Sequence, residues 1–272
     1  MNNPLVSVII PAKNVESYIG DAIASVLNQT WQNLELLIIE NDSTDRTPMI
    51  IDQFKDERIR KFTMTKSGIS LARNLGLDHS RGEYICFLDA DDILPPASIE
   101  CRINYMLENP DVSFVDGISC SFNHDMTKII DKWIPTFEGD PHYEMALIHS
   151  ACHRCMTWLY KSDAIGSVRF DPKWISLEDR HFNFLVSKGK IYKYVNEDIY
   201  HKRSRPGSLM TDHIQIEKSY LQFLNFIEQQ KIYSEDVRRS EVRNFHLMFF
   251  KTCLRDLKFL RAAQHFFKLI FN

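Results

Sequence analysis

Short apolar runs alternate with amphipathic segments along the first hundred residues of the chain. The apolar runs, rich in Val, Ile, Leu and Phe, are residues 5–10, 34–39, 84–89 and, more weakly, 60–65. The segments with apolar side chains at helical spacing are 19–27, 70–79 and 97–109. Buried strands alternating with helices of this length predict right-handed βαβ units, and hence a mostly parallel α/β sheet flanked by helices.

The rest of the chain divides at about residue 212. Between 112 and 200, strand-like runs at 112–115, 156–160 and 190–194 accompany one helical segment at 178–188. Beyond 212 the pattern is helical to the end. We therefore predict one domain over residues 1–212 and a helical C-terminal extension over 213–272.

Polar residues follow three of the apolar runs. PAKN (11–14) comes after the first, END (40–42) after the second, and DADD (89–92) after the one at 84–89. Asn14 is also of a type that caps helices, and Pro48 suits a first helical turn. Because parallel strands present their carboxyl ends at one edge, where α/β sheets bind ligands, these clusters predict a binding site there.

Bulk composition narrows the class of protein. The 272 residues are 44% hydrophobic and 25% charged, with a formal net charge of −3, which argues against nucleic acid as a partner. The N-terminal sequence lacks the features of a signal peptide, and no apolar run approaches the ~18 residues of a membrane span. Six scattered cysteines are typical of a reducing compartment, so we expect a cytoplasmic protein.

The acidic cluster Asp89, Asp91 and Asp92 predicts a divalent cation. Carboxylates at the end of a buried strand are costly unless something pairs with them. Mg²⁺ or Mn²⁺ is commonly held by one or two carboxylates together with diphosphate oxygens. A capped turn, with Asp92 at the next helix, explains the same residues, and the cluster alone leaves both interpretations open.

Three longer segments carry a family resemblance. VSVIIPAKN, SVLNQTWQNLELLIIENDSTDRT and GISLARNLGLDHSRGEYICFLDADD together resemble the bacterial family 2 glycosyltransferases, whose fold is called GT-A. The resemblance is dense over 5–96 and recurs at 177–179 and 204–208. It implies a nucleotide-binding half (1–110), an acceptor-binding half (111–212) and inverting transfer of a sugar from a nucleotide diphosphate, with Mn²⁺ or Mg²⁺ as cofactor.

The resemblance also implies roles for individual residues. The donor-binding residues would be Pro11, Ala12, Lys13, Asn14, Glu40, Asn41, Gly68, Arg73, Asp89, Ala90, Arg203, Arg205 and Ser208. The metal ligands would be Asp91 and Asp89, with His201 as a further candidate that could equally be an ordinary strand residue. Glu178 and Trp174 would contact the acceptor. The family favours an aromatic residue in place of Lys13 and an acidic one in place of Asn41, so UDP is an expectation by default.

Asp179 matches the catalytic base of the family. Carboxylates are favoured in a first helical turn by roughly 0.3–1 kcal/mol, which explains an arbitrary Glu-Asp pair without any catalysis. The position of Asp179 within the family pattern favours the base. It would accept the proton of the acceptor hydroxyl as that oxygen attacks the anomeric carbon.

Two further groups of residues have competing interpretations. His149, Cys152, His153 and Cys155 are of zinc-ligand type, but no second pair follows, which favours structural cysteines. The segment 241–272 carries a local charge of +4 among many phenylalanines. It would either lie on an anionic membrane or pack on the catalytic domain.

Two other functions share parts of this pattern. A sugar nucleotidyltransferase should have a glycine-rich loop after the first strand, where PAKN has no glycine. A relative that binds nucleotide or glycan without catalysis would be compatible with Lys13 and Asn41, whereas Asp91 and Asp179 favour an enzyme. The expected acceptor is a hydroxyl of a surface glycan such as lipopolysaccharide, O-antigen or capsule.

Overall fold

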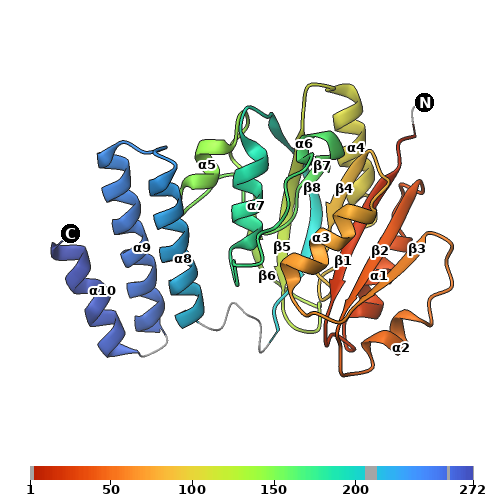
Figure 1. The fold of residues 1–272 in the computed structure, drawn as a ribbon, viewed down its shortest axis with the longest axis horizontal. Helices are drawn as coiled ribbons and strands as arrows, with labels where there is room; N and C mark the ends of the chain where they lie inside the picture. The colour runs from red at the N-terminus through yellow and green to blue at the C-terminus, as the bar shows by residue number, and fades with distance from the viewer. Residues whose placement is uncertain (1–2, 206–212, 256–257, 272) are drawn as a thin grey trace.

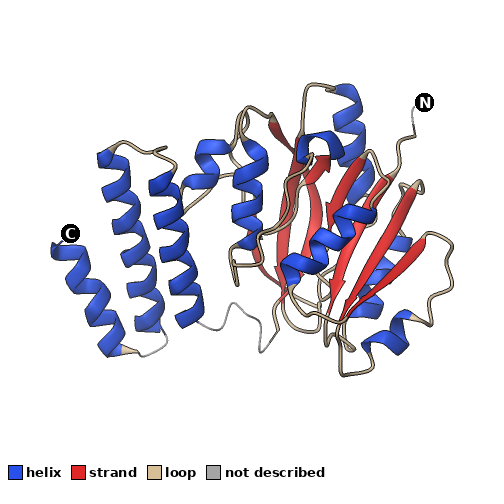
Figure 2. Ribbon diagram, viewed as in Figure 1, coloured by secondary structure: helices blue, strands red, loops and turns tan. Residues whose placement is uncertain are grey.

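The computed structural model describes residues 3–205, 213–255 and 258–271 of the chain. An eight-stranded mixed sheet forms its centre, in the order β3-β2-β1-β4-β7-β5-β6, with β8 paired to β5. Helices cover the sheet, and three further helices stand beside it at the C-terminal end (Figures 1 and 2). The predicted α/β architecture with a helical extension is therefore confirmed.

The first four strands are parallel, as the alternation of the sequence predicts. They are β1 (Val6–Ala12), β2 (Leu34–Asn41), β3 (Ile59–Met64) and β4 (Tyr84–Phe87). The helices of this part are α1 (Ile19–Leu27), α2 (Thr47–Ile51), α3 (Ile69–His79) and α4 (Ser98–Glu108). Pro48 lies in the first turn of α2, as expected.

Two of the four later strands, β6 and β7, run antiparallel to their neighbours, which the sequence did not indicate. They are β5 (Phe114–Phe122), β6 (Ile129–Trp133), β7 (Leu159–Lys161) and β8 (Tyr192–Arg203). β7 runs antiparallel to both β4 and β5. The short helices here are α5 (His142–Ala146), α6 (Ser162–Ile165) and α7 (Glu178–Ser187). Strands from both predicted halves join one sheet, and the division at residue 110 stays a prediction.

β5 and β8 continue well beyond the runs expected at 112–115 and 190–194. In β5 the polar residues of FVDGISCSF obscure a strand of which the first seven residues are buried. Asp116 is fully buried there and accepts a hydrogen bond of 3.1 Å from the Tyr192 hydroxyl of β8. Pairing between the two strands therefore supplies the partner that makes this buried carboxyl tolerable.

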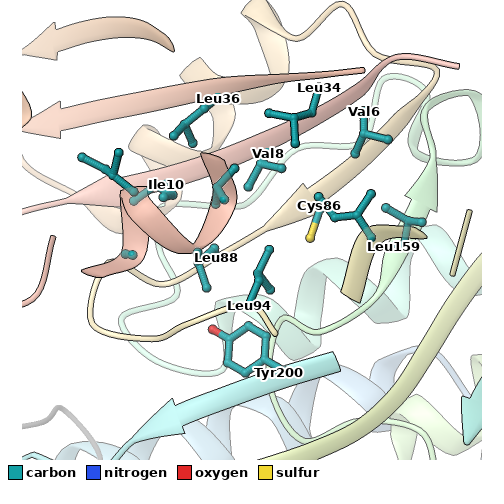
Figure 3. Close-up of a cluster of buried hydrophobic side chains, with 14 of the residues drawn as sticks. Val6, Val8, Ile10, Leu34, Leu36, Cys86, Leu88, Leu94, Leu159 and Tyr200 are labelled. Carbon is teal, nitrogen blue, oxygen red and sulfur yellow. The ribbon is translucent and has the colours of Figure 1, made fainter. Parts of the chain in front are cut away.

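Two apolar layers enclose the sheet. Helices α1 and α4 contribute to the layer on one face, and α3 and α7 to the layer on the other. All eight residues of β2 are buried between the two layers. Figure 3 shows the first layer, in which Val6, Val8 and Leu36 pack beside Cys86 and Leu88. Tyr200 of β8 points into the same cluster and reaches the loop that follows β4 (Figure 3).

A glycine lets α3 approach β1 closely. A Cβ atom at Gly76 would lie 2.4 Å from Cγ2 of Ile9, so a larger residue would push helix and strand apart. The close contact holds α3 over the strands, with its N-terminal end beside the carboxyl ends of β2 and β4. Gly76 thereby helps to place Arg73, one turn earlier, at the edge predicted to bind ligand.

The C-terminal extension consists of α8 (His213–Gln229), α9 (Glu235–Arg255) and α10 (Phe259–Phe271). They stand side by side, farther from the parallel strands than α7 (Figure 1). Phe245 and Phe249 of α9 pack with Ile216 and Ile148, and the Glu241 carboxylate accepts the Ile148 N–H at 2.6 Å. In the described part of the chain, no helix has the length and apolar character needed to cross a bilayer.

Candidate functional site

The loops after β1 and β2 are tied together by side chains. The Asn14 side-chain oxygen accepts the Thr44 N–H at 2.8 Å, and Lys13 Nζ lies 3.9 Å from Asp42. Asn14 has a φ of 50° and lies five residues before α1. The expectation that Asn14 caps that helix was wrong, because its oxygen is engaged by the neighbouring loop instead.

The residues predicted to face the nucleobase gather at this edge. Asn41 is buried, and its side-chain oxygen accepts the Gly68 N–H at 3.2 Å. Lys13 Nζ donates to Ser67 Oγ at 2.7 Å, and Glu40 accepts the Ser43 N–H at 2.7 Å. Pro11 and Ala12 form the end of β1, and Ala90 is buried in the acidic loop. The convergence of the polar strand ends is confirmed, and their contact with a base stays a prediction.

Asp92 ties the acidic loop to β8 through buried hydrogen bonds. It is 3% exposed and accepts hydrogen bonds from the Tyr200 hydroxyl (2.8 Å) and the Arg203 N–H (2.7 Å). Burial, reinforced by the charges of Asp91 and Asp89, raises the pKa of Asp92 above its ordinary value. Both carboxyl oxygens are engaged by β8, so Asp92 anchors the loop while the other two aspartates face outward.

Arg203 and Arg205 close over the same loop. Arg203 donates from Nε to the Asp91 carbonyl at 3.0 Å and from its terminal nitrogen to Asp21 at 2.8 Å. Arg205 pairs with the Asp91 carboxylate. Both guanidinium groups lie over the Tyr18 ring. Ser208, also predicted to bind the donor, lies outside the described residues.

Asp89 and Asp91 fit a divalent cation that completes its shell with substrate oxygens. Each uses one carboxylate oxygen on an arginine, and the second oxygen has no hydrogen-bond partner among the described residues. Their side chains are 34% and 20% exposed. No group of three or more His, Cys, Asp or Glu in the described residues could hold a metal. A pair of open carboxylates matches Mg²⁺ or Mn²⁺ bound mainly by phosphates and water.

His201 and Trp174 lie apart from these carboxylates. His201 Nε2 is 2.7 Å from Asp198 on its own strand, and its backbone pairs with Ile93 of the acidic loop. Trp174 is 5% exposed and stacks on His181 with 4.5 Å between ring centroids. The metal role of His201 and the acceptor role of Trp174 stay predictions, although the Trp174 ring packs in the core.

Arg73 joins the two sides of the site. Its guanidinium, 3% exposed, donates to Asp89 at 2.9 Å and to Glu178 at 2.7 Å. Asp89 follows β4 and Glu178 begins α7, so one side chain of α3 connects segments 89 residues apart in sequence. Predicted from the resemblance as a nucleotide contact, Arg73 acts in the free protein as the cation between these carboxylates.

The residue before α7 has a left-handed backbone conformation. Leu177 has φ 62° and ψ 19°, a conformation that costs a non-glycine residue roughly 1–2 kcal/mol. Glu178 and Asp179 follow in the first turn, with side chains 12% and 22% exposed. Such strain is concentrated at functional sites, and here it precedes the turn that brings Glu178 to Arg73.

The Arg73 guanidinium lies near three carboxylates, and the pKa shifts of Glu178 and Asp179 go in opposite directions. Burial opposes the charge of Arg73, but Asp89, Glu178 and Asp179 outweigh it and raise the pKa of Arg73. Burial, reinforced by Asp179 and opposed by Arg73, raises the pKa of Glu178 to about 7. Burial also opposes ionisation of Asp179, but His153, Arg73 and the Arg180 N–H outweigh it and lower its pKa. Asp179 is therefore ionised at neutral pH.

His153 belongs to this site, which the sequence did not indicate. Its Nε2 atom lies 3.6 Å from Oδ2 of Asp179, and its side chain is 5% exposed. The sequence suggests His153 only as a zinc ligand beside Cys152 and Cys155. Both are free, buried cysteines in the structure. A single histidine 26 residues before its partner has no spacing that could have revealed the contact.

Comparison with known proteins identifies the class that this fold and site define. The sequence model of glycosyl transferase family 2 matches residues 7–165, more than half of the chain, which therefore belongs to that family. An uncharacterized glycosyltransferase of Haemophilus influenzae is 45% identical over 174 residues, 62% of this chain and 67% of that protein. The Escherichia coli UDP-Glc:alpha-D-GlcNAc-diphosphoundecaprenol beta-1,3-glucosyltransferase WfgD is 42% identical over 43% of this chain and 46% of its own length. The Bacillus subtilis minor teichoic acid biosynthesis protein GgaB is 32% identical over 73% of this chain, which covers only 23% of GgaB.

Solved structures show the same GT-A fold at low sequence identity. Staphylococcus aureus TarS 1–349 in complex with UDP-GlcNAc matches 91% of this chain and 72% of its own, with a TM-score of 0.68 and 16% identity. The mannosyltransferase PcManGT of Pyrobaculum calidifontis, in complex with GDP-Man and Mn²⁺, matches 84% of this chain and 65% of its own, with a TM-score of 0.62 and 17% identity.

We predict that Glu178→Gln makes the stability of the protein less dependent on pH. A carboxyl whose pKa is raised from 4.5 to about 7 binds more protons in the folded state, so its contribution declines as pH rises through that window. Relative to wild type, the variant should gain about 1–3 kcal/mol in unfolding free energy between pH 5 and pH 7.5. Urea denaturation at both pH values measures this, with the exposed Glu57→Gln as control. An equal wild-type-to-variant difference at both pH values would contradict the assignment.

Proposed function

We propose that this family 2 glycosyltransferase is an inverting, metal-dependent enzyme that moves a sugar from a nucleotide diphosphate to a hydroxyl of a growing surface glycan. The observation that carries the proposal is the arrangement around Arg73. A donor-side carboxylate, Asp89, and an acceptor-side pair, Glu178 and Asp179, are held at the same guanidinium or directly beside it. Leaving group and base can thus act on opposite sides of one sugar.

Asp179 is the base in this mechanism. Its carboxylate accepts the proton of the acceptor hydroxyl while that oxygen forms a bond to the anomeric carbon. The bond from that carbon to the diphosphate oxygen breaks, and its electron pair leaves with the nucleotide diphosphate. Because attack comes from the face opposite the leaving group, an α-linked donor gives a β-linked product.

Asp91 and Asp89 would hold the divalent cation. When bound, the cation neutralises the charge that develops on the diphosphate as the glycosidic bond breaks. Arg205 reaches the Asp91 carboxylate from the end of β8, so it is placed to contact the same phosphates once Asp91 ligates a cation. Lys13 and Asn41 would contact the base. The bound UDP-GlcNAc of the TarS structure supports UDP as the donor nucleotide, which we adopt.

The acceptor belongs to cell-surface glycan synthesis in this proposal. WfgD carries a diphosphoundecaprenol-linked acceptor in its name and GgaB is a teichoic acid protein, which supports a lipid-linked or polymeric glycan. Membership of family 2 makes a sugar nucleotidyltransferase the weaker alternative. A relative that binds nucleotide without catalysis remains the alternative that experiment must exclude.

We predict that Asp179→Asn and Asp91→Asn fail in different ways. Asp179→Asn should lower sugar transfer at least about 100-fold, because the base is lost, while calorimetry with Mn²⁺ finds UDP binding nearly unchanged. Asp91→Asn should weaken Mn²⁺-dependent UDP binding as well as transfer. Each variant controls for the other, since both replace a carboxylate by an amide at one edge of the sheet.

Two outcomes would contradict this assignment of roles. Near-normal turnover by Asp179→Asn would show that another group takes the proton. UDP binding that is equally strong with and without Mn²⁺, in wild type and in Asp91→Asn, would show that these aspartates hold no cation. Release of free sugar from UDP-GlcNAc or UDP-glucose by the wild type would exclude the non-catalytic alternative.

The last helix supports a peripheral contact with membrane. Two polar residues of α10 face its neighbours, where Arg261 and His265 lie 3.7 and 3.5 Å from Glu217 of α8. Its outward side carries Phe259, 64% exposed, and Leu260, 86% exposed. A helix that keeps large apolar side chains exposed has an apolar surface available to a partner.

The charges around this surface favour an anionic lipid layer as its partner. Exposed Lys251 of α9 and Lys268 of α10 lie in a segment with a net charge of +4. Lysines beside exposed aromatic and aliphatic side chains are typical of helices that lie in the interface of anionic membranes. We therefore place the glycosyltransferase at the membrane surface, where a lipid-linked acceptor would be presented.

We predict that Leu260→Glu reduces binding to anionic vesicles roughly tenfold or more, because it removes an exposed leucine and adds a negative charge. Co-sedimentation with phosphatidylcholine vesicles, with and without phosphatidylglycerol, measures the effect. Ile130→Glu, at a position 54% exposed on β6, is the matched control and should bind like wild type. Equal binding by both variants, or no preference for phosphatidylglycerol, would contradict the proposal.

A further inference from the structure

His153 is the third of four polar groups that form a buried chain ending at Asp179. The Tyr160 hydroxyl of β7 donates to Oδ1 of Asn183 at 2.7 Å. Nδ2 of Asn183, on α7, is 3.2 Å from Nδ1 of His153, and Nε2 of His153 is 3.6 Å from Oδ2 of Asp179. Tyr160 and Asn183 are fully buried, so water does not compete for these contacts.

The hydrogen bond from Tyr160 to Asn183 determines which nitrogen of His153 carries the hydrogen. A phenol that donates to the amide oxygen leaves the amide nitrogen of Asn183 facing His153. That nitrogen carries only hydrogens, so Nδ1 of His153 must be the bare, accepting nitrogen. A neutral imidazole then carries its hydrogen on Nε2, the atom that faces Asp179.

We propose that His153 is a positioning residue for the catalytic base, and that Tyr160 and Asn183 select the imidazole tautomer that donates toward Asp179. The inference rests on the role of Asp179 proposed above. The donated hydrogen bond fixes one carboxylate oxygen, while the other accepts the Arg180 N–H at 2.7 Å. Contacts of this kind often lengthen in a free enzyme and shorten when substrate binds, which accommodates the 3.6 Å separation.

The aromatic core holds the chain in place. The Tyr160 ring packs against Phe87, Phe114 and Phe182, with centroid separations of 5.6 to 6.1 Å. Asn183 lies one turn after Asp179 on α7, so the two side chains on either side of His153 move with the same helix. The hydroxyl of Tyr160 is therefore fixed relative to Asp179 by packing that does not involve substrate.

Charged groups from several elements surround Asp179 and set its ionisation together with His153. Arg73 comes from α3 and Lys202 from β8, and both favour the carboxylate. The negative charges of Asp179 and of its neighbour on α7, Glu178, repel each other, which raises the pKa of Glu178. The His153 imidazole lies 3.6 Å from the Asp179 carboxylate and lowers its pKa, so its removal should act on Asp179 before it acts on the rest of the site.

Imidazole ¹⁵N NMR of the free protein tests the proposal without any substrate. The His153 signals, identified by their loss in His153→Leu, should show a protonated Nε2 and a bare Nδ1 near pH 8. Asn183→Asp should reverse this tautomer, since a carboxylate facing Nδ1 accepts a hydrogen and donates none. Tyr160→Phe should give a mixture of the two His153 tautomers. A wild type protonated on Nδ1, or a tautomer unchanged in Asn183→Asp and Tyr160→Phe alike, would overturn the proposal.

The titration of Asp179 supplies the functional readout. ¹³C NMR of labelled aspartate should show the Asp179 midpoint moving upward in His153→Leu and, less far, in Tyr160→Phe. Tyr192→Phe is the matched control, because it removes a buried hydroxyl that donates to Asp116 instead. Its Asp179 midpoint should equal that of wild type. If His153→Leu does not fold, Tyr160→Phe, which keeps the ring, still decides the matter, and an unshifted midpoint there would overturn the proposal.

The same variants separate this inference from the proposed enzyme activity. With UDP-GlcNAc or UDP-glucose and Mn²⁺, Tyr160→Phe should shift the acid limb of the kcat/KM profile to higher pH and leave the donor KM unchanged. A protein without transferase activity would still show the NMR result. An active enzyme with an unshifted acid limb would refute the positioning role alone.

Discussion

The ion pairs of Arg73 are the interaction on which the arrangement of the site depends. A single buried guanidinium holds Asp89, at the end of a parallel strand, against Glu178, at the start of a helix beyond the antiparallel strands. Removing one partner of a buried pair costs about 3–5 kcal/mol, because it leaves an uncompensated charge. The segments proposed to bind donor and acceptor are thus kept at a defined separation before any substrate binds, which would reduce the ordering that catalysis requires.

The cluster around Arg73 also separates the roles of similar side chains. Asp92, enclosed by Tyr200 and Arg203, anchors the acidic loop, while Asp89 and Asp91 each keep one oxygen open. Glu178 holds its proton more strongly than an ordinary glutamate, whereas Asp179 is ionised. Differences in burial and partners, more than residue type, make one carboxylate an anchor, two of them candidate ligands and another the candidate base.

Much of this organisation follows from sequence, and the exceptions have physical reasons. Strongly apolar strands such as 34–39 and the polar residues after them predicted the parallel half and the ligand-binding edge. The extent of β5 was hidden because Asp116 becomes tolerable only through a partner on a distant strand. His153 was not predicted as part of the site, because contact between a loop and a helix leaves no periodic pattern. Asn14 was misplaced because tertiary hydrogen bonds override its local preference for a helix start.

The stereochemistry of sugar release tests the central claim most directly. Water can replace the acceptor, so the enzyme with Mn²⁺ and a UDP-α-linked sugar should slowly release free sugar whose first-formed anomer is readable by ¹H NMR before mutarotation. Asp179 as base and a single displacement predict the β anomer at early times, and loss of this release in Asp179→Asn. Initial release of the α anomer would contradict the account, because it requires attack from the face of the leaving group.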